Sequence, residues 1–279
     1  MKKFEGILLC TDLDGTLLRA DKSISKKNLE AIDYFKSNGG RFTFITGRVP
    51  KAAQAVYEAV RPNAPIGCFN GGGVYDFEAD AFLHFSTLSE EATVLAALVD
   101  RELPEVGIQL NTARNVYFCK DNPAQQDFRA ATGLPYKVCP YRNRSEDVGK
   151  MIFLHREKEV LERLEKLLTT HPLSERFDFI RSERTIFEIL PKGASKGAAL
   201  ARIAESCGVD MRRTVAIGDY DNDVSMLKAA AIGVAVSNAS EAAKRAADYT
   251  TVSNEEHAIA RVISDLDSGH IAFEKEGNL

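Results

Sequence analysis

The length of this chain, 279 residues, exceeds what one compact core usually holds and suits two domains. Its 40 aspartate and glutamate residues outnumber its 36 lysine and arginine residues, which gives a net charge of −4. A chain with this balance has no global attraction for nucleic acid or for an anionic membrane, so neither is expected as a partner. The net charge does not argue against a small phosphorylated ligand, because a few local cations suffice to bind one.

The cysteines and the apolar runs exclude further classes of protein. The five cysteines form no Cys-x-x-Cys or Cys/His cluster, so we expect neither a disulfide framework nor a structural zinc site. The N-terminus turns acidic too early for a signal peptide, and the longest mostly apolar run, 229–240, is too short to span a bilayer. These features predict a cytoplasmic protein with reduced thiols.

The first third of the chain alternates strands and helices. Short apolar runs such as Gly6–Thr11 are typical of strands that are buried on both faces. The helical pattern that follows ends at Gly39 and Gly40. The predicted strands are Gly6–Thr11, Arg41–Thr46 and Ile66–Phe69, and the predicted helices are Ser25–Asn38 and Pro50–Val60. This alternation predicts a parallel sheet with right-handed crossovers.

The middle of the chain differs in kind from its two ends. It mixes helical patterns at Ser89–Leu103, Ala124–Thr132 and Glu157–His171 with strands within Gly107–Lys120, at Met151–His155 and within Phe177–Pro191. The last third returns to alternation, with strands at Thr214–Ile217, Ile232–Val236 and near Tyr249, and helices at Ser195–Cys207, at Asp221–Ala230, from Ser240, and ending near Leu266. We therefore predict an α/β protein in which 1–82 and 192–279 form a parallel-sheet domain and 83–191 form an inserted α+β domain.

Two aspartates directly follow the first predicted strand. Ligands of open parallel sheets bind beyond the carboxyl ends of the strands, which is where Asp12 and Asp14 fall. If this segment is extended, both carboxylates lie on one side, and Gly15 permits the turn that follows. Carboxylates this close need a cation or a shared proton, and Mg²⁺ is a hard ion that prefers oxygen ligands. A simple Asp-Gly turn with a helix-capping role is the alternative.

Two further segments favour an anion site. The second predicted strand ends at Thr46, so its hydroxyl and the Gly47 N–H lie at the start of a helix, where anions bind. Lys196 lies in the first turn of a predicted helix, where the macrodipole opposes a cation that has no anionic partner. An ordinary N-cap at Thr46 and a solvated Lys196 are the alternatives.

A third polar segment follows the predicted strand Thr214–Ile217. Asp219, Asp221, Asn222 and Asp223 place four acceptor side chains within five residues. Carboxylates packed this closely favour a bound cation, although they could also complement a helix dipole. All of these segments lie just past strand ends of one predicted sheet, which favours a single common site.

The sequence resembles the haloacid dehalogenase-like hydrolase superfamily and, within it, the Cof-type sugar-phosphate phosphatases with a type IIB cap. The motifs that carry the resemblance are TDLDGTLL at 11–18, FITGR at 44–48, FNGGGVYD at 69–76, FEILPKGASKGAAL at 187–200, GDYDNDVSML at 218–227 and GVAVSNASEAAKRAADYTTVSN at 233–254. The resemblance implies a Rossmann-like core with an inserted α+β cap. It also implies an Mg²⁺-dependent phosphatase for small phosphorylated metabolites, sugar phosphates foremost.

The resemblance further implies a role for each candidate residue. Asp12 is the expected nucleophile and a metal ligand, and Asp14 is the expected general acid and base, which also offers its backbone carbonyl to the metal. Asp219 is the expected third ligand, while Asp223 is expected to support the metal site or to orient Lys196. The groups expected to hold the phosphoryl group are the Leu13 N–H, Thr46, the Gly47 N–H, Lys196 and Asn222.

Two other functions are compatible with the same motifs. A phosphohexomutase of this fold would return the phosphoryl group to a sugar, although 187–196 follows the phosphatase pattern. A regulator that only binds a phosphometabolite would usually lack one of the carboxylates present here. The sequence leaves the substrate open among hexose phosphates, erythrose phosphate, pyridoxal phosphate and flavin mononucleotide, and it leaves the oligomeric state open as well.

Overall fold

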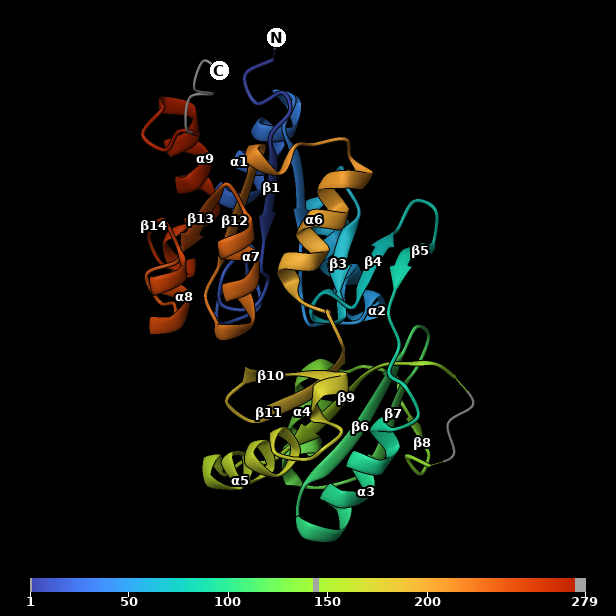
Figure 1. Cartoon of the computed structure of the whole chain (residues 1–279). Helices are drawn as coiled ribbons and strands as arrows, with labels where there is room; N and C mark the ends of the chain where they lie inside the picture. Colours follow the sequence, from blue (N-terminus) through green and yellow to red (C-terminus); the bar gives the residue numbers. More distant parts are fainter. Residues whose placement is uncertain (1, 143–145, 274–279) are drawn as a thin grey trace. The chain divides into compact units, whose positions relative to one another are not determined.

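The computed structural model describes residues 2–142 and 146–273, which form two units (Figure 1). The first unit contains the described residues of Met1–Thr46, Gln54–Leu83 and Ser195–Leu279. The second contains those of Gly47–Ala53 and His84–Ala194. In the described part of the chain, no helix is both long enough and apolar enough to cross a bilayer.

A five-stranded parallel sheet organises the first unit and confirms the predicted α/β fold class. Its strands are β1 (Leu8–Thr11), β2 (Arg41–Phe44), β12 (Thr214–Gly218), β13 (Ile232–Ala235) and β14 (Tyr249–Thr250), in the order β14-β13-β12-β1-β2. The helices of this unit are α1 (Lys26–Ser37), α6 (Lys196–Ser206), α7 (Val224–Ala229), α8 (Glu241–Ala246), α9 (Ala258–Ser268) and, from Gln54 onward, α2 (Pro50–Val60). β1 is fully buried between β2 and β12, as its apolar run predicts.

A smaller three-stranded sheet was not predicted in full. It consists of β3 (Ile66–Cys68), β4 (Gly73–Asp76) and β5 (Ala81–Phe85), with β3 and β4 antiparallel. The prediction that the third strand reaches Phe69 is wrong, because Phe69 and Asn70 both have a φ of +54° and end the strand. An isolated parallel bridge between Ile45 and Gly67 connects β3 to the segment after β2.

The second unit has the predicted α+β composition. Its six-stranded sheet contains β6 (Gly107–Thr112), β7 (Val116–Lys120), β8 (Lys137–Val138), β9 (Val148–Leu154), β10 (Phe177–Glu183) and β11 (Ile186–Pro191), in the order β10-β11-β9-β6-β7-β8. Its helices are α3 (Ala92–Glu102), α4 (Pro123–Thr132) and α5 (Lys158–Thr169). All neighbouring strands are antiparallel except β7 and β8, which are parallel.

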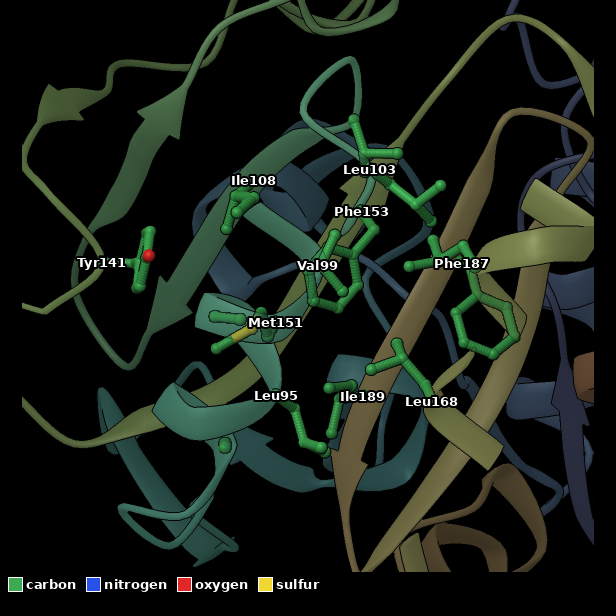
Figure 2. Packing of buried hydrophobic residues seen from close by; sticks show 14 of the residues in the cluster. Leu95, Val99, Leu103, Ile108, Tyr141, Met151, Phe153, Leu168, Phe187 and Ile189 are labelled. Carbon is green, nitrogen blue, oxygen red and sulfur yellow. The ribbon is translucent and has the colours of Figure 1, made fainter. Parts of the chain in front are cut away.

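The core of the second unit lies between this sheet and the helices α3 and α5. Figure 2 shows Leu95 and Val99 of α3 packing with Phe153 of β9 and Ile189 of β11. The buried residues of α5 recur at helical spacing and end at Leu168, so the amphipathic pattern that predicted this helix defines the face it buries.

Candidate active site

The site begins where two adjacent parallel strands end. Asp12 directly follows β1, and Asp219 directly follows β12, which pairs with β1 in the sheet. The backbone N–H of Asp12 continues this pairing by donating to the Ile217 carbonyl at 2.8 Å. Two carboxylates from distant parts of the sequence are thus placed at the same sheet edge, where α/β proteins bind their ligands.

Lys196 joins this edge from the start of α6. Its helix begins at an N-cap, Ser195, whose hydroxyl accepts from the Ala198 N–H. The Lys196 side chain is fully buried, and its Nζ lies 2.5 Å from Asp12 Oδ1 and 2.5 Å from Asp223 Oδ1. The two carboxylates are the anionic partners that a cation in a first helical turn requires.

Asp223 holds Lys196 and the loop after β12 at the same time. Its second oxygen, Oδ2, accepts from the backbone N–H of Asp219 at 2.9 Å and of Tyr220 at 3.0 Å. Gly218 makes room for this arrangement, since a Cβ there would lie 2.5 Å from the Asp223 Cβ. Both carboxylate oxygens therefore have protein partners, which suits a residue that orients its neighbours.

Asp219 is fixed by the loop that follows Asp12. Thr16 Oγ1 donates to Asp219 Oδ1 at 2.5 Å. Gly15 passes close to the same carboxylate with a φ of +87°, and a Cβ at this position would lie 2.5 Å from Asp219 Oδ2. Only glycine fits both the backbone angle and the space, as the predicted turn requires.

The carboxylates form a cluster that suits a hard cation. Ligand oxygens of Asp12, Asp219 and Asp223 lie within 4.8 Å of one another. Among the described residues, Lys196 is the cation that pairs with this cluster, through Asp12 and Asp223, so three carboxylates share one ammonium in a largely buried place. Mg²⁺ prefers oxygen ligands and is usually bound through one or two carboxylates, which Asp12 and Asp219 can supply, so the donor set fits this ion.

The pKa values report the same excess of negative charge. Burial raises the pKa of Asp12 well above its usual range, with Asp223 and Asp219 adding to the shift and Lys196 opposing it. Burial and the charge of Asp223 raise the pKa of Asp219 to about 6, and Asp14 adds to this shift. Burial by itself lowers the pKa of Lys196, but Asp12 and Asp223 outweigh it, so the pKa is raised and the side chain stays charged.

Asp14 lies nearby but on the open side of the site. β1 ends at Thr11 and Leu13 lies in a turn, so Asp12-Leu13-Asp14 does not continue the strand and strand alternation does not orient Asp14. The Asp14 carboxylate is 32% exposed and lies 2.8 Å from the ammonium of Lys22. The charge of Asp14 still raises the pKa of Asp219, so Asp14 lies at the edge of the acidic cluster.

The residues expected to bind phosphate are held by a neighbour that sequence reasoning missed. Asn70 donates its backbone N–H to the Thr46 carbonyl at 3.0 Å, and its side-chain oxygen accepts from Asn222 Nδ2 at 3.1 Å. The left-handed backbone of Asn70, tolerated by asparagine, lets it connect both segments. The Asn-Gly pair directly after the third predicted strand was the sequence feature from which the special role of Asn70 could have been suspected.

Leu13 and Gly47 can offer only backbone groups. The Leu13 side chain is fully buried, so its N–H, next to Asp12, is the group it could present to an anion. Gly47 follows Thr46 in sequence but belongs to the second unit by its contacts. In that unit its carbonyl accepts from Lys150 Nζ at 2.8 Å, and Lys150 also pairs with the buried Glu188 at 2.7 Å.

Two more supporting residues were missed. The hydroxyl of Thr16 was not singled out, although it belongs to the first motif and orients Asp219. Ser225 accepts from the Gly197 N–H at 3.1 Å and so ties the start of α6 to α7. Neither contact could be inferred from the sequence, because each joins segments that are far apart along the chain.

Comparison with known proteins agrees with the family that the sequence motifs resemble. A family model described as haloacid dehalogenase-like hydrolase matches residues 9–263. A 5-amino-6-(5-phospho-D-ribitylamino)uracil phosphatase of Bacillus subtilis is 32% identical over 92% of this chain and 96% of its own. A pyridoxal phosphate phosphatase of Escherichia coli is 28% identical over 92% of this chain and 97% of its own. The fold also matches a crystal structure of a haloacid dehalogenase-like hydrolase from Bacteroides thetaiotaomicron with a TM-score of 0.80. That protein is 26% identical, and the match covers 93% of this chain and 99% of that one.

Proposed function

Since the chain belongs to the haloacid dehalogenase-like hydrolase family, we propose that it is a magnesium-dependent phosphatase that works through an aspartyl-phosphate on Asp12. One observation carries the proposal: the buried ammonium of Lys196 joins Asp12 to Asp223, and these two carboxylates form a cluster with Asp219. A nucleophilic carboxylate, a fixed cation and a metal-binding donor set are what transfer of a phosphoryl dianion requires.

The acidic cluster supports a metal site of defined composition. The side chains of Asp12 and Asp219 and the backbone carbonyl of Asp14 would hold Mg²⁺, and Asp223 would support them. When bound, this ion supplies the positive charge that keeps Asp12 ionised and offsets the repulsion between carboxylate and phosphate. Thr16 would keep Asp219 oriented toward it.

Asp12 performs the first chemical step. Its carboxylate attacks phosphorus, an acyl phosphate forms, and the bond between phosphorus and the ester oxygen breaks. Lys196 holds Asp12 Oδ1 and contributes positive charge to the transferring group, together with the N–H groups of Leu13 and Gly47 and the side chains of Thr46 and Asn222.

Asp14 moves the protons in both steps. It first gives its proton to the departing alkoxide and then takes one from the water that attacks the phosphorus of the acyl phosphate. That attack releases inorganic phosphate and regenerates Asp12. The partial exposure of Asp14 supports this role, since its carboxyl group is open to solvent while Asp12 is buried.

The substrate is a small phosphorylated metabolite, for which we favour an ester on a sugar or polyol chain. This choice rests on the Bacillus subtilis relative that is 32% identical, whose named substrate carries its phosphate on a ribityl group. A pyridoxal phosphate phosphatase is nearly as similar, so an aromatic phosphate belongs in the same assay panel. Cap residues within 83–191 would set this preference.

The proposal is tested with Asp12→Asn, which removes the nucleophile and keeps the shape of the side chain. We expect the release of inorganic phosphate from sugar phosphates and pyridoxal phosphate to fall by at least about a thousandfold, since a group that acts in covalent catalysis is lost. Excess EDTA should abolish the wild-type rate, and added Mg²⁺ should restore it. Turnover of Asp12→Asn at the wild-type rate, or an isomerised sugar phosphate in place of free phosphate, would refute the proposed reaction.

A further inference from the structure

Two cysteines of the second unit lie close to each other at the edge of its sheet, Cys119 on β7 and Cys139 directly after β8. β7 and β8 pair in parallel, with Tyr117 opposite Lys137 and the following residues opposite each other. β8 ends at Val138, and continuing its register by one position would set Cys119 opposite Cys139. Paired strands lie about 4.8 Å apart, and the Cα atoms of a disulfide are usually about 4.4–6.8 Å apart. The backbone spacing of this pair therefore suits a disulfide.

The same register predicts that the side chains of the two cysteines point to one face of the sheet. The Lys137 ammonium lies over the Tyr117 ring, 5.7 Å from its centroid, so this registered pair shares a face. Side chains alternate between faces along a strand, so residues two positions on return to that face. Cys119 and Cys139 each lie two positions beyond this pair.

The surroundings of the two thiols agree with this placement. Both line one small cavity, together with Thr112, Pro140 and Glu146. Burial raises the pKa of Cys119 to about 12, and the nearby Cys139 adds to the shift. Cys119 also packs against the buried cluster that contains Tyr141, labelled in Figure 2, two positions after Cys139. Strand register, a shared cavity and mutual electrostatic interaction thus place the two sulfurs together.

We propose that Cys119 and Cys139 are a redox-active pair that closes into a disulfide when a small disulfide such as oxidised glutathione is present. Both are thiols in this structure. This modification site is independent of the phosphatase reaction and uses none of its residues. The pairing was not expected from the sequence, because 19 residues separate the two cysteines and only the short strand β8 brings them together.

The exchange proceeds in two balanced steps. The thiolate of Cys139 attacks one sulfur of glutathione disulfide, forming a mixed disulfide and releasing one glutathione. Cys119 then attacks the Cys139 sulfur, passing its proton to the second departing glutathione, so that two protein thiols are oxidised and one disulfide is reduced to two thiols. Cys139 reacts first because it follows an exposed edge strand, whereas burial keeps Cys119 protonated.

The crosslink would fasten the edge of the sheet. β8 has only two residues, both exposed, and it pairs with β7 alone among the described strands. The ring closed by the disulfide contains α4, which packs through Ala124 on Ile152 and Ile186 of the sheet. Oxidation would thus fix Cys139, at the end of the 119–139 segment, to β7, the strand in which that segment begins.

The test uses the full chain incubated in glutathione buffers of increasing oxidised fraction, then alkylated and digested with trypsin. Cleavage after Arg114, Lys120, Lys137 and Arg142 yields peptides 115–120 and 138–142, each with one of the two cysteines. We expect mass spectrometry to find them joined by a disulfide in a fraction of chains that rises with oxidised glutathione and returns to zero with dithiothreitol.

The other cysteines provide internal controls. Cys10 and Cys207 also interact electrostatically, but Cys10 is fully buried in β1 and the pair has no strand register. Cys207→Ser should therefore leave the joined peptides unchanged, while Cys139→Ser should abolish them. The inference is overturned if the wild-type chain keeps 115–120 and 138–142 unlinked, whether alkylated or separately glutathionylated, under the most oxidising buffer. The phosphatase assay is not the readout, so this result and that of Asp12→Asn are independent.

Discussion

Lys196 is the residue around which the candidate site is built. Burying an ammonium costs free energy that is recovered only when good anionic partners surround it. Asp12 and Asp223 are both at 2.5 Å, and they raise the pKa of Lys196 in spite of its burial. The ammonium thus stays charged, in contact with the carboxylate that is proposed to attack phosphorus.

Replacing Asp223 by asparagine tests how far Lys196 depends on its second partner. The amide presents one acceptor instead of two, so either the Lys196 ammonium or the N–H groups of Asp219 and Tyr220 lose their acceptor. We expect the free energy of unfolding to fall by about 3 kcal/mol, the cost of breaking a buried pair, and kcat to fall at least about tenfold.

Urea denaturation and steady-state kinetics measure these two effects. Asp210→Asn is the matched control, since Asp210 pairs with Arg212 at the exposed surface, and its loss should leave the free energy of unfolding nearly unchanged. Equal, small changes in both variants would show that Lys196 does not need Asp223.

Thr16→Val addresses the orientation of Asp219. Valine keeps the shape of threonine but cannot donate to Asp219 Oδ1. Loss of such a supporting hydrogen bond typically weakens a metal site about 10–100-fold. The Mg²⁺ concentration for half-maximal activity should rise by that factor, with a near-normal rate at saturation. Thr170→Val, which removes an exposed hydroxyl, should leave the Mg²⁺ dependence unchanged; the same curve for both variants would argue against Asp219 as a ligand.

At the scale of elements, the sequence was most informative where apolar patterns are long. The strands of the parallel sheet and the helices α1, α5 and α6 follow their predicted ranges closely, because each buries one continuous face. β4 and β5 were missed, since they are short and largely half-buried. β8 was missed because two exposed residues carry no periodic signal.

The segment before β9 illustrates a contact between elements that depends on pH. Glu146 accepts from Thr112 Oγ1 at 2.6 Å, Tyr117 Oη at 2.6 Å and Asn115 Nδ2 at 2.7 Å, which joins this segment to the β6–β7 hairpin. These hydrogen bonds, those from Thr112 and Tyr117 foremost, lower the pKa of Glu146 to about 2. The ionised form is therefore the one that stabilises the fold.

Glu146→Gln should be less stable than the wild-type chain at pH 7. A depressed pKa contributes stability that is fully present above the unfolded value of about 4.5 and is lost as the pH falls through about 2. The difference in free energy of unfolding between the two chains should therefore shrink as the pH is lowered from 5 toward 2. Urea titrations at several pH values measure it, and a difference that stays constant over this range would exclude the ionised Glu146 as its source.

At the scale of the whole molecule, the site is assembled from segments that are remote in sequence. Lys196 and Asp12 are 184 positions apart, and Thr16 and Asp219 are 203 apart. The sequence predicted which strand ends would meet, because the carboxyl ends of parallel strands share one edge of a sheet. It could not predict the partner of each side chain, such as Asn70 for Asn222 or Lys22 for Asp14, since these depend on loop conformation.

The proposed reaction depends on transfer of the phosphoryl group to Asp12, and trapping that intermediate tests it most directly. Wild-type enzyme turning over a sugar phosphate with Mg²⁺ is quenched in acid within milliseconds. It is then digested, and the mass of peptide 4–19 is measured. We predict a population that carries one additional phosphoryl group on Asp12, that is removed by hydroxylamine as acyl phosphates are, and that is absent from Asp12→Asn. A steady-state turnover during which peptide 4–19 never gains this group, at any quench time, would contradict the proposed aspartyl-phosphate mechanism.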